Sequence, residues 1–155
     1  MPTNVYVPEG EVLEGNDVFL VSRVVRADGV YLSRADVDLT ETGSVVNVSV
    51  YDLEDRSITQ AAMWTSTTNG DDLADDTLTV LVATAGDLLT DGYWDGLDGT
   101  GYNFRLRLKY GGAVPIGPLL EGGHSYRVEV EVVTNTGFGS VRWAHVVAVR
   151  SLLST

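Results

Sequence analysis

Cysteine is absent from this sequence of 155 residues. The chain therefore forms no disulfide bond, has no thiol chemistry and lacks the usual zinc-binding spacings. Basic residues are scarce as well, since 10 Lys and Arg stand against 22 Asp and Glu and give a net charge of −12. An acidic surface of this kind repels phosphate, so we expect neither a nucleic-acid partner nor an anionic membrane. The net charge favours a protein partner that offers basic groups.

Long apolar segments are also missing. No stretch approaches the roughly 20 apolar residues that a membrane helix needs. The first residues, MPTNVY, have neither the basic nor the apolar part of a signal peptide. We therefore expect a chain that is not secreted by the general route.

Few methionines and many glycines indicate strands and turns rather than helices. The chain has two Met against 17 Gly, and the strand-favouring residues Val, Thr and Tyr are abundant. A hydrophobic content of 44% and a charged content of 21% are typical of an ordered globular protein. The length suits one domain, which we predict over residues 1–155.

Alternation of apolar and polar residues predicts several β-strands. In residues 45–53, valine occupies the alternate positions 46, 48 and 50. Residues 18–26 form a β-branched run that stops before the turn pair Asp28-Gly29. The period of two recurs in residues 102–110, 126–132 and 141–149, with a hairpin turn at 135–137. Another strand is expected in residues 78–83, and a weaker candidate in residues 58–65.

These short segments, about seven to nine strands separated by turn signals, predict an all-β fold. The expected architecture is an immunoglobulin-like antiparallel β-sandwich, with a jelly roll or a small barrel as the alternative. Two acidic segments, residues 66–76 and 86–101, are expected to form long loops.

The two histidines give no sign of catalysis. Neither His124 nor His145 belongs to a recognisable motif with Ser or Cys, and no G-x-S-x-G sequence occurs. We expect one surface histidine and one structural histidine, and we assign no catalytic residue, no bound cofactor and no enzymatic activity.

Aspartates recur along the second acidic segment. Asp91, Asp95 and Asp98 offer the hard oxygen ligands that calcium prefers, but their spacing differs from that of an EF-hand. A solvated loop is the simpler interpretation, and the three residues are a candidate calcium site beside it.

Tyr93 and Trp94 lie among these carboxylates. Three interpretations of the pair stay open. The rings belong to the core under a long loop, to a hot spot for a protein partner, or to a platform on which sugars stack.

A basic stripe of Arg105, Arg107 and Lys109 follows one predicted strand. The simpler interpretation is a solvent-facing strand that pairs with Glu129 and Glu131 if the two strands are neighbours. The alternative is a face that docks an acidic partner. Further candidate partner contacts are the apolar residues near the two ends, namely Val5, Tyr6, Val7, Leu152 and Leu153.

The order of several segments resembles the immunoglobulin-like domains of tailed-bacteriophage virion proteins, of which the amino-terminal domain of baseplate upper proteins is one example. The segments are EVLEGND at 11–17, DG at 28–29, VSVYDL at 48–53, GYNF at 101–104, GHSYRVE at 123–129 and TNTG at 134–137. The resemblance spans most of the chain, although no shoulder or receptor-binding region follows the domain.

This resemblance implies a non-enzymatic structural protein of a virion that is assembled in the host cytoplasm. Such a protein docks on capsid subunits as a decoration protein, or on neck or tail subunits, as a homo-oligomer or in many copies. The alternative is a carbohydrate-binding or adhesin-type β-sandwich module that uses Tyr93, Trp94 and the neighbouring aspartates.

Overall fold

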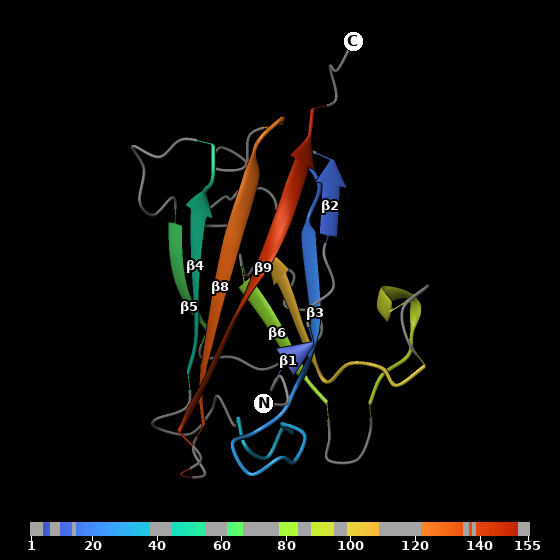
Figure 1. Ribbon diagram of the computed structural model, residues 1–155, viewed down its shortest axis with the longest axis vertical. Helices are drawn as coiled ribbons and strands as arrows, with labels where there is room; N and C mark the ends of the chain where they lie inside the picture. The colour runs from blue at the N-terminus through green and yellow to red at the C-terminus, as the bar shows by residue number, and fades with distance from the viewer. Residues whose placement is uncertain are drawn as a thin grey trace.

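The computed structural model of the chain describes residues 5–6, 10–13, 15–37, 45–54, 62–66, 78–83, 88–94, 99–108, 122–134, 137 and 139–151. These residues form nine strands and one short 3₁₀ helix (Figure 1). The strands are β1 (Val5–Tyr6), β2 (Gly10–Leu13), β3 (Val18–Val24), β4 (Val45–Asp52), β5 (Ala62–Ser66), β6 (Leu78–Val82), β7 (Phe104–Leu108), β8 (Ser125–Val133) and β9 (Ser140–Arg150), and the helix is η1 (Gly92–Trp94). Among the described residues no helix is long and apolar enough to cross a membrane.

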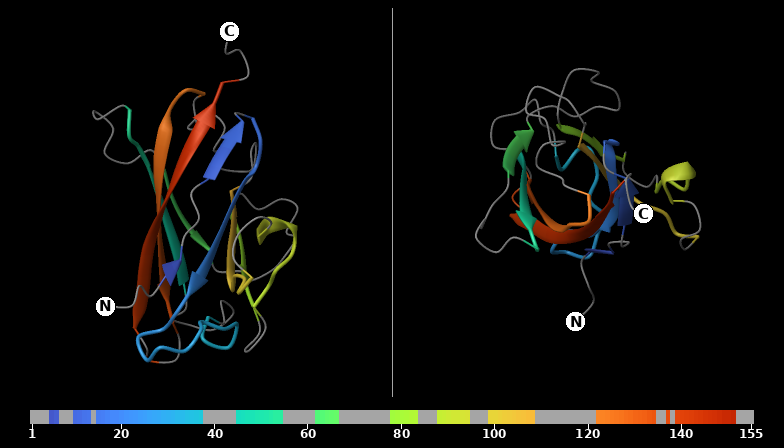
Figure 2. Two further views of the ribbon diagram at one scale, coloured as in Figure 1. Left: turned by 45° about the vertical axis from the view of Figure 1, so that its right-hand side comes forward. Right: turned by 90° about the horizontal axis from the view of Figure 1, so that it is seen from above.

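The strands form two sheets that face each other across one core (Figure 2). One sheet has the order β1-β3-β7-β6 and the other the order β2-β9-β8-β4-β5. The first order is that of the A, B, E and D strands of an immunoglobulin domain, and β9, β8, β4 and β5 occupy the places of G, F, C and C′. All pairs are antiparallel except β2 with β9, which is parallel. The predicted immunoglobulin-like sandwich is therefore confirmed.

The core follows from the period of two in the long strands. Along β9 every second side chain from Val141 to Val149 is buried and the intervening ones face outward. In the register of the five-stranded sheet, Val48 lies opposite Val130, which in turn lies opposite Trp143. The Trp143 ring meets the edge of Phe104 from the other sheet, with ring centroids 4.9 Å apart and nearly perpendicular planes. This contact joins the two layers at the centre of the sandwich.

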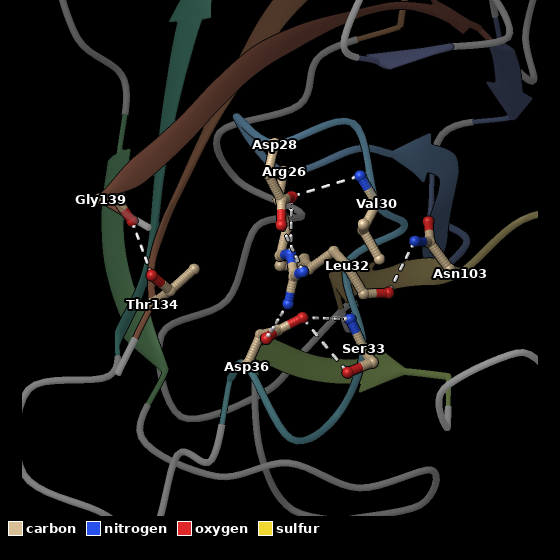
Figure 3. Close-up of polar contacts among 9 residues, drawn as sticks. All are labelled: Arg26, Asp28, Val30, Leu32, Ser33, Asp36, Asn103, Thr134 and Gly139. Carbon is tan, nitrogen blue, oxygen red and sulfur yellow. Dashed lines mark hydrogen bonds and ion pairs between the residues drawn. The ribbon is translucent and has the colours of Figure 1, made fainter. Parts of the chain in front are cut away.

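The predicted turn at Asp28-Gly29 is present and is closed by the backbone. The Arg26 N–H donates to the Val30 carbonyl at 2.8 Å, and the Gly29 N–H donates to the Arg26 carbonyl at 3.0 Å. Gly29 has a φ of +86°, a left-handed conformation that glycine adopts without a steric penalty. The predicted hairpin of the last two strands is also present, and both the backbone N–H and the hydroxyl of Thr134 donate to the Gly139 carbonyl (Figure 3).

Arg26 forms ion pairs that link this turn to the chain that follows it. Arg26 Nη1 donates to Asp36 Oδ1 at 2.8 Å, and Arg26 also binds both carboxylate oxygens of Asp28. Asp36 is buried, and its second oxygen accepts from the backbone N–H and the hydroxyl of Ser33 (Figure 3). The carboxylate is thus satisfied on both oxygens, as a buried charge requires.

Asn103 departs from the alternation expected for residues 102–110. Its side chain is buried with 2% exposure, although the sequence pattern places it on the outward face with Arg105 and Arg107. The amide oxygen accepts from the Val24 N–H at 2.7 Å, while the amide nitrogen donates to the Val24 and Leu32 carbonyls, each at 2.8 Å. The Asn103 side chain therefore supplies the partners that the end of β3 and the returning chain need in the interior.

Replacing Asn103 with Ala should strongly destabilise the fold, because three buried backbone groups would lose their partners. At about 1–3 kcal/mol for each stranded group, we expect a loss of at least about 3 kcal/mol in the free energy of unfolding, measured with chemical denaturant. Asn47→Ala is the matched control, since this amide lies on an outer sheet face and donates to Glu131, and its loss should stay below about 1 kcal/mol. Equal losses in the two variants would show that the Asn103 contacts do not hold the fold.

Candidate functional site

A short excursion between β6 and β7 packs on the outer face of the four-stranded sheet (Figure 1). Leu89 and Tyr102 exchange two backbone hydrogen bonds of 2.8 and 2.9 Å. Trp94, on η1, is buried against Tyr102 with ring centroids 5.8 Å apart, and Val21 of β3 completes this small outer cluster. The sheet face under the excursion is therefore covered, whereas Phe19 on the same face of β3 is exposed.

Glycine at position 101 allows the segment of Tyr102 to lie close to the segment of Leu89. Gly101 has a φ of +98°, and a Cβ atom there would lie 2.5 Å from the Leu89 carbonyl oxygen. The Gly101 carbonyl in turn accepts from Arg23 Nη1 at 3.2 Å. The Tyr102 hydroxyl contacts both oxygens of Asp91, at 2.9 and 2.8 Å. Burial, together with this carboxylate, raises the pKa of Tyr102 to about 12, so the hydroxyl stays protonated and donates to Asp91.

At the edge of the excursion, two aromatic rings and two guanidinium groups form one continuous stack. The Arg105 guanidinium carbon lies 4.4 Å from the Tyr93 ring centroid, Tyr93 lies 5.0 Å from Phe19, and the Arg107 carbon lies 5.6 Å from Phe19. Phe19 and Tyr93 are exposed, at 39% and 45%. Asp17 binds Arg107 from the end of the stack, at 2.8 Å. We call Phe19, Tyr93, Arg105 and Arg107 the arginine–aromatic surface.

The sheet register explains how these residues come together. Phe19 on β3 lies directly opposite Arg107 on β7, and Val21 lies opposite Arg105. The outward-facing side chains of β3 therefore lie beside the outward-facing side chains of β7. Tyr93, on η1, lies against them. Cation–π contacts of this kind contribute about 0.5–1 kcal/mol each at exposed positions, so the stack orders side chains that would otherwise move freely.

The structure unites three of the residues that the sequence analysis named as partner contacts, Tyr93, Arg105 and Arg107, and separates a fourth from them. Trp94 is 3% exposed, so its ring is not offered on the surface of the chain, and the core interpretation fits its position. Phe19 was missed, although a signal existed: in the apolar run of residues 18–24 it occupies the face opposite to Val18 and Leu20.

The condition for pairing the basic strand with Glu129 and Glu131, that the two strands are neighbours, is not met, because these residues lie in different sheets. β7 pairs with β3 and β6, whereas β8 pairs with β4 and β9. Glu131 instead binds Arg142 and accepts from Asn47 at 3.0 Å, and Glu129 binds Arg127 at 3.0 Å. The hydrogen bond from Asn47, followed by the contact with Arg142, lowers the pKa of Glu131.

These carboxylates line a shallow hollow of about 730 Å³ on the outer face of the five-stranded sheet. Its lining combines the polar side chains of Asn47, Ser49, Glu129, Glu131 and Arg142 with Val130, Trp143 and Ala144. The charged groups are bound to one another or to Arg127, as described above. Among the described residues, the ion pair of Arg142 with Glu131 joins β9 to β8, and the hydrogen bond from Asn47 to Glu131 joins β4 to β8.

The remaining predicted contacts are only partly described. Val5 and Tyr6 form β1, which pairs with the end of β3, whereas Val7, Leu152 and Leu153 lie outside the described residues. Of the candidate calcium ligands, Asp91 is described and accepts from the Tyr102 hydroxyl and the Tyr93 N–H. Asp95 and Asp98 lie outside the described residues, and within the described part of the chain no group of three or more acidic or histidine side chains could hold a metal ion. The calcium site stays a prediction.

The two histidines have different environments. His145 is buried with 1% exposure, and the Trp143 indole N–H donates to its Nε2 at 2.9 Å. Burial lowers the pKa of His145 to about 4. His124 is partly exposed, and its Nδ1 lies 2.9 Å from an Asp52 oxygen. His145 is thus the structural histidine that the sequence analysis expected, and it is neutral near pH 7.

Comparison with known proteins gave little. No protein-family model matches the chain, and no curated protein matches it. Among solved structures, the chain is similar to AggA, the major subunit of aggregative adherence fimbriae type I from Escherichia coli, with 9% identity over 96% of this chain and 94% of that chain. The TM-score is 0.37, a value at which the likeness carries no argument about fold or function.

Tyr93 and Trp94, adjacent in the sequence, should differ sharply when each is replaced by Ala. Removal of the buried Trp94 ring should lower the free energy of unfolding by about 3 kcal/mol, because it empties the outer cluster. Removal of the exposed Tyr93 ring should lower it by less than about 1 kcal/mol. Denaturant titration of both variants checks this, and a larger loss in Tyr93→Ala would contradict the placement of the two rings.

The buried His145 should make the fold sensitive to acid. Its pKa is lower in the folded chain, about 4 against an ordinary 6.5, so the unfolded chain binds a proton first as the pH falls. The contribution of buried, neutral His145 to the free energy of unfolding is fully present above pH 6.5. This contribution falls by roughly 3 kcal/mol as the pH drops to about 4.

The variant His145→Gln isolates this contribution from that of the carboxylates, since Gln offers an acceptor to Trp143 but does not titrate. Unfolding curves of both proteins between pH 7 and pH 4 should converge, with the unsubstituted protein losing more stability. If both proteins lost the same stability between pH 7 and pH 4, burial of a neutral His145 would not contribute to the acid sensitivity of the fold.

Proposed function

We propose that this chain is a non-enzymatic structural protein that docks on a protein partner through the arginine–aromatic surface. The observation that carries the proposal is the pair of exposed rings held between two guanidiniums, with Phe19 and Tyr93 5.0 Å apart. Aromatic residues and Arg are the side chains enriched at protein interfaces and at their energetic hot spots. Because the rings and guanidiniums already contact one another in the isolated chain, docking on this surface requires little rearrangement of them.

A carbohydrate-binding role finds less support in this geometry. The sugar-stacking interpretation rested on neighbouring rings at positions 93 and 94, and the second of these rings is buried. One face of Tyr93 is covered by the Arg105 guanidinium at 4.4 Å. A sugar would have to displace this cation before stacking on that face of the ring.

The location of the protein in a tailed-phage virion is also a proposal, and it rests on the sequence resemblance. In this account the domain docks on capsid subunits as a decoration protein in many copies, with neck or tail subunits as the other placement. An exposed patch on the outer face of the four-stranded sheet suits repeated docking on identical subunits, since the same patch must fit at each site.

Docking through this surface predicts a specific loss when its rings are removed. The double variant Phe19→Ser/Tyr93→Ser should bind the purified particles at least about tenfold more weakly, because a hot-spot ring contributes on the order of 2 kcal/mol. Copies per particle, counted by quantitative mass spectrometry after co-sedimentation, measure the effect.

The matched control is Val30→Ser/Tyr31→Ser. It also removes two exposed apolar side chains, which are 51% and 43% exposed at the Asp28-Gly29 turn, and it should keep the full copy number. Equal binding by both double variants would reject the arginine–aromatic surface as the docking site. Absence of the unsubstituted chain from purified particles would reject the virion placement. Binding of the protein to a glycan array that is lost when Tyr93 is replaced would favour the adhesin-type alternative.

A further inference from the structure

We propose that His145 is an acid-sensitive switch in the core, whose protonation breaks its hydrogen bond with Trp143 and releases the ring contact between the two sheets. This role is independent of the arginine–aromatic surface. It places the first acid-induced change at one pair of side chains, ahead of the loss of the whole fold.

The hydrogen bond determines which nitrogen of neutral His145 carries the proton. The Trp143 indole N–H can only donate, and it lies 2.9 Å from His145 Nε2. Nε2 is therefore the acceptor, and the proton of the neutral ring is on Nδ1. Nδ1 is buried and has no hydrogen-bond partner among the described residues. A second proton therefore binds at Nε2, the atom that faces Trp143.

Protonation at Nε2 places two N–H donors opposite each other, so the hydrogen bond between Trp143 and His145 is lost. The imidazolium is then a buried cation, since His145 is 1% exposed, and a buried charge without a partner is costly. The two side chains must separate for the ring to reach an acceptor or water. Trp143 is also the ring that meets Phe104 at 4.9 Å, so its displacement removes the contact that joins the layers.

The described side chains around His145 are mostly apolar. Those that β3 and β7 place in the core are apolar except for Ser22, whose hydroxyl likewise has no hydrogen-bond partner in the described chain. On β8, Val128 lies directly opposite His145, and Val12 is the described side chain of β2 that packs on the core. These neighbours offer the imidazolium no carboxylate.

The titratable groups on the inward faces lie further along the sandwich. Tyr126 follows on the buried face of β8, and His124 stacks on it with ring centroids 6.3 Å apart. The His124 Nδ1 atom lies 2.9 Å from an Asp52 oxygen. The buried carboxylate of Asp36 is bound on both oxygens, as described above. Burial, rather than one of these charges, is the cause that lowers the pKa of His145.

NMR of the unsubstituted protein tests the switch. The Trp143 indole N–H signal, the His145 ring nitrogens and the backbone amides of β4 are followed from pH 7 through the range around pH 4 in which His145 titrates. At pH 7 the proton should be found on Nδ1. As Nε2 takes up its proton, the Trp143 signal should move upfield with the same midpoint, because its hydrogen bond is lost. The β4 amides should still show the folded state at that midpoint.

Two variants separate the hydrogen bond from burial. In His145→Gln the Trp143 signal should stay in place over the same pH range, because Gln accepts but does not titrate. In Trp143→Phe the ring remains but the N–H donor is gone, so His145 should bind its proton at least about threefold more tightly, in keeping with the loss of one hydrogen bond.

Three results would overturn the switch. The first is a proton on Nε2 instead of Nδ1 at pH 7, and the second is a Trp143 signal that does not move when His145 is protonated. The third is loss of the β4 amide signals at the same midpoint as the Trp143 shift, which would show global unfolding without a local step. These three readouts come from the unsubstituted protein and do not require either variant to fold.

Discussion

The side-chain amide of Asn103 is the interaction on which the rest of the structure depends. Its three hydrogen bonds tie β7 to the end of β3 and to Leu32, while its backbone carbonyl accepts from Ala83 at the end of β6. The residue before it, Tyr102, belongs to the outer cluster, and the residue after it, Phe104, belongs to the core between the sheets. Asn103 therefore fixes the position at which the chain leaves the outer excursion and enters β7. This position sets the register of β7 in which Arg105 and Arg107 face outward.

The arginine–aromatic surface is a consequence of that register. Its members come from three different elements, β3, η1 and β7, and none of these elements forms the surface alone. The sandwich supplies rigid outward positions on β3 and β7, and the outer cluster around Trp94 holds Tyr93 over them. Aromatic rings held between cations are suited to a protein partner.

Periodicity predicted the strands well because half-buried strands must alternate. The apolar faces of β4, β8 and β9 were named from the sequence, and the immunoglobulin-like architecture followed. Strand order was not predictable, since pairing depends on contacts across the whole chain, and for this reason the sequence left open whether the strand of Arg105 and Arg107 lies beside that of Glu129 and Glu131. Asn103 was missed because a buried amide breaks the alternation that identified its neighbours. Trp94 and Tyr93 look alike in sequence, and only the packing of η1 on Val21 separates a core ring from a surface ring.

The central claim is that the outer face of the four-stranded sheet is the face that meets a protein partner. A cryo-electron-microscopy map of the assembly that contains this chain tests it most directly. The account predicts partner density over Phe19 and Tyr93, and solvent over the hollow around Glu131. Partner density over the five-stranded sheet, with the arginine–aromatic surface open to solvent, would contradict it.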